Sequence, residues 1–418
     1  MHMKFIKPKS KVLLIEPPFY RFFGYQRWYY PVTLTLVATY LEEMGHQACV
    51  YDADRPTLDC RSLAREEVRR NYHHYEEALA DDNHHIWQEV RRTIEELRPD
   101  VVGLSSITPK IDSADIVARI AKEILGDRVV TMLGGPHVQG MLKSHPGCDF
   151  GPYFDHIVSA IPNLINRKPN RRLILDQDVY SADFFSTLMT SSGCPNTCTF
   201  CCHSFEKAMI YRDLENLRSE VEEIWEKYHA TASITTMDDC FFSNQRHFES
   251  VTNLFREYGL AFSVGARVMA LSPEKIERFI KYGGSRLYIG VESGSQRILD
   301  KIEKRLRVEE IVRRTRWLNE SGIQWSAFFI TGFPFETIDD MKMTVELINT
   351  IRPTFVSLNR FTPYPGTKIY DDYFKTSGLV YKDLFQLNER SVVNLSDEME
   401  NYIASMYTMF DAYNNNNK

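Results

Sequence analysis

The sequence predicts an α/β protein with a doubly wound, Rossmann-like parallel sheet, then a partial (β/α)6 barrel, then a short C-terminal extension. Two observations support this prediction. Short apolar runs alternate with amphipathic helical patterns along most of the chain, and the alternation falls into two separate blocks. The chain of 418 residues is long enough for two or three domains. We expect a first unit over residues 9–170, a second over 183–370 and the extension over 371–418.

In the first unit, apolar runs predict four buried parallel strands, over residues 11–15, 48–51, 101–106 and 129–133. Helical patterns follow between Pro31 and Gly45 and over 113–125. Residues 56–98 form a polar insertion rich in His, Arg and Glu, which we expect to be helical. A stunted fifth strand at 148–150 and a helix over 153–166 complete the unit. Ligands of such sheets bind at the carboxyl ends of the strands.

The second unit contains six further apolar, β-prone runs, over residues 184–189, 233–237, 262–264, 286–291, 326–330 and 356–359. Helical patterns fill most of the gaps, over 214–228, 247–258, 273–282, 308–321 and 338–350. Six such repeats fit a partial barrel, where chemistry lies at the carboxyl ends of the strands. The extension, residues 371–418, is rich in Tyr and Phe and could close the barrel mouth, whereas its run Asn414–Asn417 is expected to fray.

Composition and charge exclude several function classes. Hydrophobic content of 43% and charged content of 25% are ordinary for a globular protein. A net charge of −6 and a pI near 6.1 argue against a nucleic-acid-binding surface. No apolar run reaches the ~18 residues that span a bilayer, and the N-terminus opens no signal peptide. We therefore expect a cytoplasmic protein with neither a nucleic-acid partner nor a membrane span.

The most informative segment of the chain is a run of three cysteines, Cys194, Cys198 and Cys201, with the spacing C-x3-C-x2-C. This spacing lets one loop wrap three thiolates around three corners of a cubane iron–sulfur cluster. Because a [4Fe–4S] cluster takes four ligands, one iron would stay open to a small molecule. The three cysteines are therefore candidate metal ligands.

Other uses of these cysteines fit less well. A structural zinc site usually pairs two cysteines with a distant Cys or His pair; here only His203 could complete the set, and it crowds against Cys201. A disulfide framework is typical of small secreted chains. Cys202 is interpreted as a buried thiol or a group near the ligands, and the remaining cysteines, which are isolated, as core residues: Cys49, Cys60, Cys148 and Cys240.

The cysteine motif, with Phe200 directly before its last cysteine, resembles that of the radical S-adenosylmethionine (SAM) enzymes. The resemblance implies that the open iron chelates the amino and carboxylate groups of SAM. One electron from the reduced cluster would then cleave SAM to methionine and a 5′-deoxyadenosyl radical, which abstracts hydrogen from a C–H bond. A reductant such as flavodoxin or ferredoxin would supply the electron.

Further segments are similar to barrel motifs of the same family. Asp238 and Asp239 end the second strand, where the family receives the SAM amino group, although acids at strand ends are often caps. The segment Gly290–Ser293 looks like the family's G-V-E-S block, whose Glu292 and Ser293 would face the ribose or carboxylate. Arg267 could clamp the carboxylate or form a salt bridge at the barrel rim.

The turn over residues 332–337 resembles the G-x-P-x-E-T turn that lies near adenine in this family, except that Phe335 replaces its middle glycine. A later segment, Tyr364–Thr367, matches one that follows the sixth strand and is expected to be structural. Tyrosines near the expected barrel mouth are candidates for substrate contact on position alone: Tyr364, which could also be catalytic, Tyr370 and Tyr373.

The first unit resembles the cobalamin-binding domain that precedes many radical SAM barrels. The similarity rests on Pro-x-x-Leu at Pro31–Leu34, the run Pro99–Ser105 and the turn Gly134–His137. It implies cobalamin contacts from the loops after the strands: Ser105, Ser106, Thr108, Gly134, Gly135 and His137. The two glycines would let the backbone approach a large planar cofactor. The D-x-H-x-x-G motif of base-off enzymes is absent from Glu16 to Gly24, so the alternative is an empty scaffold domain.

The resemblance favours a cobalamin-dependent C-methyltransferase that acts on an unactivated carbon of a small-molecule or natural-product-type substrate. The alternative is a non-methylating radical SAM enzyme, such as a dehydratase, an epimerase, or a ring-forming or rearrangement enzyme, whose first domain lacks cobalamin. A third class, a non-catalytic cluster protein, is disfavoured because Glu292 and the strand-end acids accompany the cysteines.

Overall fold

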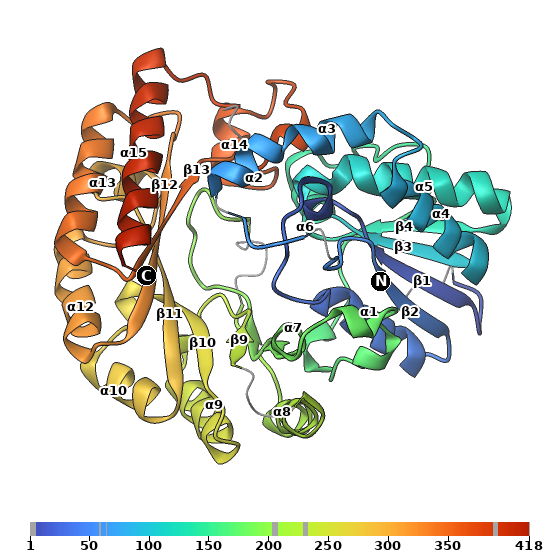
Figure 1. Ribbon diagram of the computed structural model, residues 1–418, viewed down its shortest axis with the longest axis horizontal. Coiled ribbons are helices and arrows are strands. Elements are labelled where there is room, and N and C mark those ends of the chain that lie inside the picture. Colours follow the sequence, from blue (N-terminus) through green and yellow to red (C-terminus); the bar gives the residue numbers. More distant parts are fainter. Residues whose placement is uncertain are drawn as a thin grey trace. The chain divides into compact units, whose positions relative to one another are not determined.

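The computed structural model describes residues 6–57, 60–63, 65–202, 208–228, 233–387 and 392–417. The chain divides into two compact units. Figure 1 shows the chain coloured by its position in the sequence. Unit 1 comprises Met1–Phe185, Tyr364–Gly366 and Tyr370–Arg390. Unit 2 comprises Ser186–Pro363, Thr367–Ile369 and Ser391–Lys418. The segment expected as a separate extension is thus divided between the two units.

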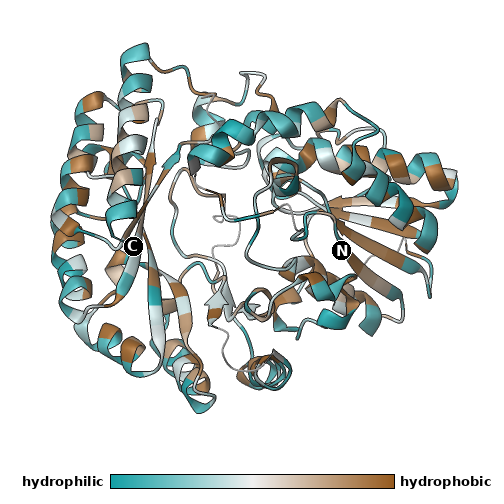
Figure 2. Cartoon of the chain, in the orientation of Figure 1, coloured by the Kyte–Doolittle hydropathy of each residue, from teal (hydrophilic) through white to brown (hydrophobic). Residues whose placement is uncertain are grey.

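Unit 1 is built on a five-stranded parallel sheet with the order β2-β1-β3-β4-β5. Its strands are β1 (Lys11–Glu16), β2 (Gln47–Asp52), β3 (Val101–Ser105), β4 (Val130–Gly134) and β5 (His156–Val158). Figure 2 shows these strands as largely hydrophobic, as expected for strands covered on both faces. The second strand is added on one side of β1 and the later strands on the other side, starting with β3, so this sheet is doubly wound, as predicted.

Helices connect the strands of unit 1 in the predicted places, except for α6 (Pro136–Ser144), which was not predicted. The others are α1 (Val32–Glu43), α2 (Arg65–Asn71), α3 (His73–Leu79), α4 (His85–Leu97) and α5 (Ile111–Leu125). The polar insertion over 56–98 therefore folds into three helices. The longest of them, α4, buries Ile86, Trp87, Val90 and Ile94 in the core, so its apolar stripe holds the insertion against α5.

The prediction for the end of unit 1 was wrong. Residues 148–150 form no strand, because Asp149 accepts a hydrogen bond from Gly151 N (3.0 Å) and closes a turn. The fifth strand is instead β5, and of the helix expected over 153–166 only a 3₁₀ turn at Leu164–Asn166 is present. Apolar residues at helical spacing over 153–166 predicted a helix, but those at 156–158 belong to the short edge strand β5.

Unit 2 is built on a six-stranded parallel sheet in which strands consecutive along the chain lie side by side, in the order β13-β12-β11-β10-β9-β6. These strands are β6 (Thr187–Leu188), β9 (Ile234–Thr236), β10 (Phe262–Arg267), β11 (Gly284–Glu292), β12 (Gln324–Thr331) and β13 (Phe355–Arg360). The connecting helices are α8 (Leu214–Tyr228), α9 (Gln245–Glu257), α10 (Pro273–Lys281), α11 (Gln296–Lys301), α12 (Val308–Ser321) and α13 (Ile338–Ile351). This is the predicted partial (β/α)6 barrel.

The first strand of unit 2 is shorter than predicted. The expected run over 184–189 begins as helix α7 (Ala182–Phe185), and only β6 pairs with β9. The ring of Phe185 packs on Tyr30 and Tyr180 in unit 1, which removes it from the strand. A small antiparallel pair follows, β7 (Ser191–Ser192) with β8 (Ile210–Tyr211), and the cysteine loop leaves from β7.

The chain ends in helix α15 (Asp397–Asn416), which packs against β13 and α13. The expectation that Asn414–Asn417 frays is wrong for Asn414, which is only 7% exposed. Its side chain accepts a hydrogen bond from Val356 N (2.8 Å) and donates one to Val356 O (2.9 Å). The amide thereby satisfies backbone groups of the edge strand β13. Within the described residues, no helix is long and apolar enough to cross a membrane.

Candidate functional site

The three candidate ligand cysteines lie on one loop that is anchored at its centre. All eight cysteines of the chain are free thiols, and Cys198 is buried whereas Cys194 and Cys201 are half-buried. The loop turns back on itself through a hydrogen bond from Cys201 N to Cys198 O (3.2 Å). Thr199 N donates to Ile302 O (3.0 Å), which fixes the loop to the segment after α11. His203, the alternative zinc ligand, lies outside the described residues.

The environment of Cys194 favours the thiolate. The thiol of Cys240 donates to Cys194 Sγ (3.4 Å), and Asn196 Nδ2 donates to the same sulfur (3.3 Å). The hydrogen bond from Cys240, helped by Asn196 and by the charge of Arg267, lowers the pKa of Cys194 to about 5 against the effect of burial. A thiolate is the form that ligates metal. Three sulfur donors on one loop thus fit three corners of a [4Fe–4S] cluster.

Glu292 lies at the carboxyl end of β11 in a strained conformation. Its φ of 74° is in the left-handed region that L-residues rarely adopt, and the pairing of β11 with β12 shifts register between Gly290 and Glu292. The side chain is buried and accepts a hydrogen bond from Lys304 Nζ (2.6 Å). Strain of this kind persists where the surroundings enforce it, and it is concentrated at functional sites.

Lys304 joins Glu292 to the cysteine motif. It is itself buried, and its Nζ lies 5.9 Å from the centre of the Phe200 ring. Its carbonyl accepts a hydrogen bond from Arg267 Nη2 (3.1 Å). Three residues predicted from separate motifs, Phe200, Arg267 and Glu292, are therefore connected through one lysine that no motif marked.

The two strand-end aspartates differ in their surroundings. Asp238 is buried, and its carboxylate accepts hydrogen bonds from Thr190 N (2.7 Å), Ser191 N (2.8 Å) and Thr190 Oγ1 (2.5 Å). Burial raises the pKa of Asp238 to about 6 in spite of these donors. Asp238 thus ties the end of β9 to the start of the cysteine loop, and the neighbouring Asp239 is half-buried.

Two further predicted segments are held by hydrogen bonds within unit 2. Ser293 is buried, with its Oγ 3.3 Å from Thr344 Oγ1, and it accepts from Ser295 N (3.1 Å). In the turn after β12, Glu336 accepts from Gly332 N (2.5 Å), Phe333 N (3.2 Å) and Thr331 Oγ1 (3.2 Å), and burial raises its pKa to about 7. The turn forms although Phe335 replaces a glycine.

The predicted residues at the carboxyl edge of the first sheet bond to one another. Ser106 N donates to Gly134 O and His137 N donates to Ser106 O, each at 3.0 Å. A Cβ on Gly135 would lie 2.7 Å from Ser106 N and 2.8 Å from Ser105 Oγ. With φ 101° and ψ 179°, Gly135 also adopts a conformation open only to glycine. Close packing of the loops after β3 and β4 thus accounts for Gly135.

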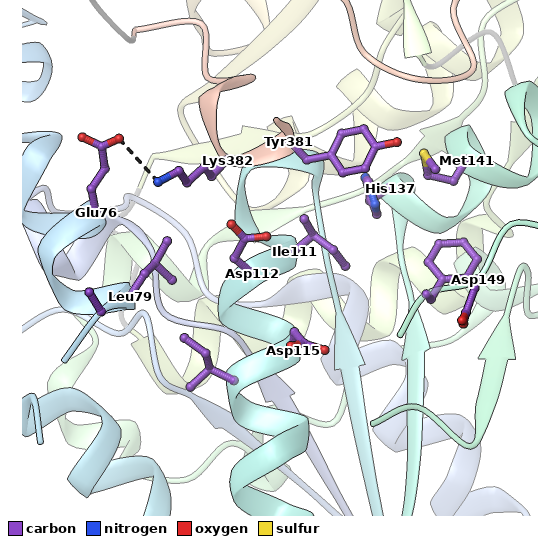
Figure 3. Close-up of a pocket in the computed structure, with 13 residues that line it drawn as sticks. Glu76, Leu79, Ile111, Asp112, Asp115, His137, Met141, Asp149, Tyr381 and Lys382 are labelled. Atoms are coloured by element: carbon purple, nitrogen blue, oxygen red, sulfur yellow. Dashed lines mark ion pairs between the residues drawn. The ribbon is translucent and has the colours of Figure 1, made fainter. Parts of the chain in front are cut away.

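A cavity of about 520 Å³ opens beside this edge, and His137 is the one predicted residue among those that line it (Figure 3). Burial lowers the pKa of His137 to about 4, so the imidazole is neutral at pH 7, and its Nδ1 lies 3.3 Å from Thr108 Oγ1. The remaining lining residues come from α3, α5, α6 and two loops: Glu76, Leu79, Ala80, Ile111, Asp112, Asp115, Ile116, Met141, Asp149, Phe150, Tyr381 and Lys382.

Acidic and apolar side chains are interspersed along the cavity (Figure 3). Asp112 and Asp115 project from the first turns of α5, and burial raises the pKa of both. Glu76 pairs with Lys382 Nζ (3.6 Å), the ion pair drawn in Figure 3. Such a cavity suits a ligand with hydrogen-bond donors and an apolar portion.

A buried network of charges occupies the ends of β1 and β2. Lys110 Nζ donates to Glu16 Oε1 (2.6 Å) and Asp54 Oδ2 (2.8 Å). Arg27 pairs with Asp52 (2.5 Å), which also accepts from the hydroxyl of Tyr180 at 2.5 Å. The other oxygen of Asp54 accepts from Phe19 N and Arg21 N, so this network sets the path of the loop after β1.

Comparison with known families agrees with both halves of this geometry. The sequence model of the radical SAM superfamily matches residues 188–348, and that of the B12 binding domain matches residues 27–157. The chain belongs to the radical SAM superfamily and carries a B12-binding domain. It is therefore an enzyme of that superfamily, whose members use a [4Fe–4S] cluster and SAM, and its first domain matches the model of a domain that binds cobalamin.

The relatives of this radical SAM protein include a methyltransferase and a cyclase. An uncharacterized methyltransferase of Pyrococcus horikoshii is 27% identical over 341 residues, which cover 71% of this chain and 73% of the relative. The anaerobic magnesium-protoporphyrin IX monomethyl ester cyclase of Rubrivivax gelatinosus is 25% identical over 336 residues, 68% of this chain and 60% of the cyclase.

Two solved structures share the fold. The radical SAM methyltransferase TsrM from Kitasatospora setae, with tryptophan and a SAM analogue bound, has a TM-score of 0.61 at 16% identity and covers 85% of this chain and 74% of its own. The cobalamin-dependent radical enzyme OxsB has a TM-score of 0.58 at 15% identity and covers 97% of this chain and 56% of its own. At these identities the likeness concerns the fold.

In this radical SAM protein, sequence reasoning found the ligand loop but missed several residues that surround it. The missed residues nearest the cysteines are Lys304 and Cys240, and neither belongs to a motif that the sequence analysis used. The positive φ angles of Glu303 (51°) and Arg305 (53°) place Lys304 at the centre of an unusual turn, which has no sequence signal. Tyr364, the candidate catalytic residue, belongs to unit 1, where its charge interacts with Tyr20.

Proposed function

We propose that this enzyme reductively cleaves SAM at a [4Fe–4S] cluster bound by Cys194, Cys198 and Cys201 and transfers a methyl group to an unactivated carbon of a small molecule. The observation that carries the proposal is the arrangement of the three thiols on one anchored loop, with the buried Glu292–Lys304 pair linked to the same loop through Phe200. The sequence match to a B12 binding domain supports the methyl transfer.

In the proposed mechanism, the residues of unit 2 bind and orient the reactants. The three cysteine thiolates would hold the cluster as three of its four ligands, and SAM would take the remaining ligand position. Asp239, which is half-buried at the end of β9, is the acceptor we assign to the SAM amino group, whereas the buried Asp238 holds the start of the cysteine loop. Glu292 is assigned to the ribose hydroxyls and Arg267 to the carboxylate. When bound, the cluster and SAM supply the 5′-deoxyadenosyl radical, and cobalamin supplies the methyl group.

The cavity beside His137 supports cobalamin binding in unit 1. Its volume of about 520 Å³ lies within the range that holds a drug-sized ligand. A corrinoid is larger than that, so we assign to this cavity only a part of the cofactor. A neutral His137 can donate or accept one hydrogen bond there, and Asp112 and Asp115 can accept hydroxyl donors. The names of the relatives, two of which are methyltransferases, agree with this assignment.

A non-methylating radical reaction is the second candidate. It is favoured by the likeness to the cyclase of Rubrivivax gelatinosus and by the packing of Gly135 against Ser105 and Ser106, which needs no cofactor to explain it. In both candidates the partners we expect are a small-molecule substrate and a one-electron reductant such as flavodoxin or ferredoxin.

The deciding experiment is anaerobic reconstitution with iron, sulfide and hydroxocobalamin, followed by measurement of bound iron and corrinoid and of 5′-deoxyadenosine formation. We expect one cluster and near one corrinoid per chain, with corrinoid retention reduced in His137→Ala and unchanged in the exposed His73→Ala control. A cluster with SAM cleavage but no corrinoid would replace methyl transfer by the second candidate. A protein that holds no cluster would refute both.

A further inference from the structure

Cys240 lies in direct contact with a candidate cluster ligand. Its side chain is 3% exposed, and its Sγ donates to Cys194 Sγ at 3.4 Å. The other isolated thiols have different neighbours: Cys49 Sγ lies 3.9 Å from Val12 O, and Cys60 Sγ lies 3.2 Å from Thr57 Oγ1. The sequence alone predicted that Cys240 is a core residue, and the residue is indeed buried. Its contact with Cys194 indicates a role besides packing.

Rigid surroundings hold the Cys240 thiol in place. The preceding Asp238 is tied to Thr190 and Ser191 at the start of the cysteine loop. The following Phe241 and Phe242 are fully buried, and both rings contact Phe248 edge-on. The main chain on both sides of Cys240 is therefore fixed, and the thiol has little freedom to leave the Cys194 sulfur.

The contact is a hydrogen bond and not a second ligation. Cysteines that ligate different corners of a cubane point away from one another, so their sulfurs lie farther apart than 3.4 Å. The distance and the donor assignment fit an S–H group directed at a thiolate. Asn196 Nδ2 directs a second donor at the same sulfur (3.3 Å), so the Cys194 sulfur is the acceptor of two protein donors.

We propose that Cys240 is a positioning residue for the cluster, whose thiol donates a hydrogen bond to the Cys194 sulfur and raises the reduction potential of the cluster. The inference rests on the ligand assignment within the proposed function. Hydrogen bonds to cluster sulfurs stabilise the reduced form, which carries more negative charge, and are a recognised determinant of cluster potential. A higher potential lets a biological reductant deliver the electron more readily.

The test is an EPR-monitored redox titration of the reconstituted enzyme without SAM, on four variants and the wild type. Cys240→Ala and Cys240→Val both remove the donor, the first with a smaller and the second with a larger side chain, whereas Cys240→Ser keeps a hydroxyl donor. Cys49→Ala is the control for loss of an unrelated thiol. We expect unchanged iron content throughout, a midpoint shifted to more negative potential in Cys240→Ala and Cys240→Val, and a midpoint in Cys240→Ser that returns toward that of the wild type.

Two results would overturn the inference. A midpoint in Cys240→Ala and Cys240→Val equal to that of Cys49→Ala would show that the thiol does not tune the cluster. Loss of the cluster in every Cys240 variant would make this residue a ligand. Failure of the proposed function is distinguishable, because it appears as a wild-type protein without a cluster.

Discussion

The carboxyl edges of the two sheets are built in contrasting ways. In unit 2, chemically reactive groups gather at the edge: three thiols on one loop, none of them in a disulfide, and a strained Glu292 paired with one lysine. In unit 1, the charged groups at the ends of β1 and β2 pair with one another, and the cavity lies beside the ends of β3 and β4. Glu16, Asp52 and Asp54 form ion pairs with Lys110 and Arg27, and the loops after β3 and β4 pack on one another through Gly135.

The contrast shows that a shared sheet architecture does not dictate where chemistry is located. A cluster needs several ligands from one short segment, so a local motif suffices to build its site. The cavity of unit 1 is instead assembled from α3, α5, α6, the loop at Asp149 and the segment at Tyr381, which are far apart in the sequence. The following predictions test this difference, from the largest expected effect to the smallest.

The largest effect is expected at the cysteine loop. Cys198→Ala removes the buried central ligand. Three cysteine ligands leave one iron of a [4Fe–4S] cluster for SAM, and two would leave a second iron without a protein ligand. We expect loss of the cluster absorbance after reconstitution and a fall of 5′-deoxyadenosine formation to the level of iron-free protein. Cys148→Ala, at an isolated thiol of unit 1, serves as the control. A Cys198→Ala protein that still cleaves SAM would refute the ligand assignment and remove the basis of the comparison.

The Glu292–Lys304 pair should be the next most sensitive feature. Removing one partner of a buried ion pair leaves an unpaired charge, which costs roughly 3–5 kcal/mol. We expect Lys304→Met to lower the free energy of unfolding by about that amount, and the double variant Glu292→Gln/Lys304→Met to recover much of it. Urea titrations measure both. The exposed pair of Lys342 with Asp339 provides the control, and an equal response of Lys342→Met would contradict a special role for the buried pair.

Most helices and strands of both units could be predicted from the sequence, because hydrophobic periodicity is a local property of the chain. The helices predicted over 214–228 and 308–321 coincide with α8 and α12. The six strands of the large sheet in unit 2 were placed within a few residues, whereas β7 and β8 were not predicted. Three kinds of feature could not be read. The first is the ion pair of Lys304, which lies in an unusual turn, with Glu292. The second is the contact of Cys240, which follows β9, with Cys194 on the cysteine loop. The third is the hydrogen bond of Asn414 to the edge strand β13, about sixty residues earlier in the sequence. Each depends on tertiary contact between residues with no shared spacing.

In unit 1, Gly135→Ala tests whether the edge is closed by packing. An added Cβ meets the backbone of Ser106 and Ser105 Oγ, and the conformation is one that only glycine adopts readily. Gly126→Ala is a matched control, because Gly126 also has a positive φ (61°) but no atom within 4 Å of an added Cβ. Both variants carry a backbone cost of about 1–3 kcal/mol.

The steric cost separates the two glycines. We expect Gly135→Ala to lower the free energy of unfolding by a further 1–3 kcal/mol or so relative to Gly126→Ala, the usual cost of overpacking. Urea titrations of the protein without added cobalamin measure this difference. Equal losses in the two variants would mean that the space beside Gly135 can open, and would return this glycine to the role of a cofactor contact.

A pH-dependent difference is expected at Glu336, in the turn after β12. Burial raises the pKa of this carboxyl from 4.5 to about 7 in the folded protein. The folded state therefore binds the proton more tightly than the unfolded chain does, so this group lowers the free energy of unfolding as pH rises from about 4.5 to about 7. Above pH 7 its contribution stays constant, with a total on the order of 3 kcal/mol at most.

Glu336→Gln removes this titration while keeping an oxygen that can accept from Gly332 N, Phe333 N and Thr331 Oγ1. The stability of the variant relative to the wild type should therefore be greater at pH 8 than at pH 5. Glu310→Gln is the control: the pKa of the half-buried Glu310 is lowered to about 2 by its hydrogen bonds with Arg313 and Arg314, so its contribution does not change between these two pH values. If the relative stability of Glu336→Gln were the same at pH 5 and pH 8, the Glu336 carboxyl would be hydrated in solution, and the turn after β12 would be more open than the closed one described here.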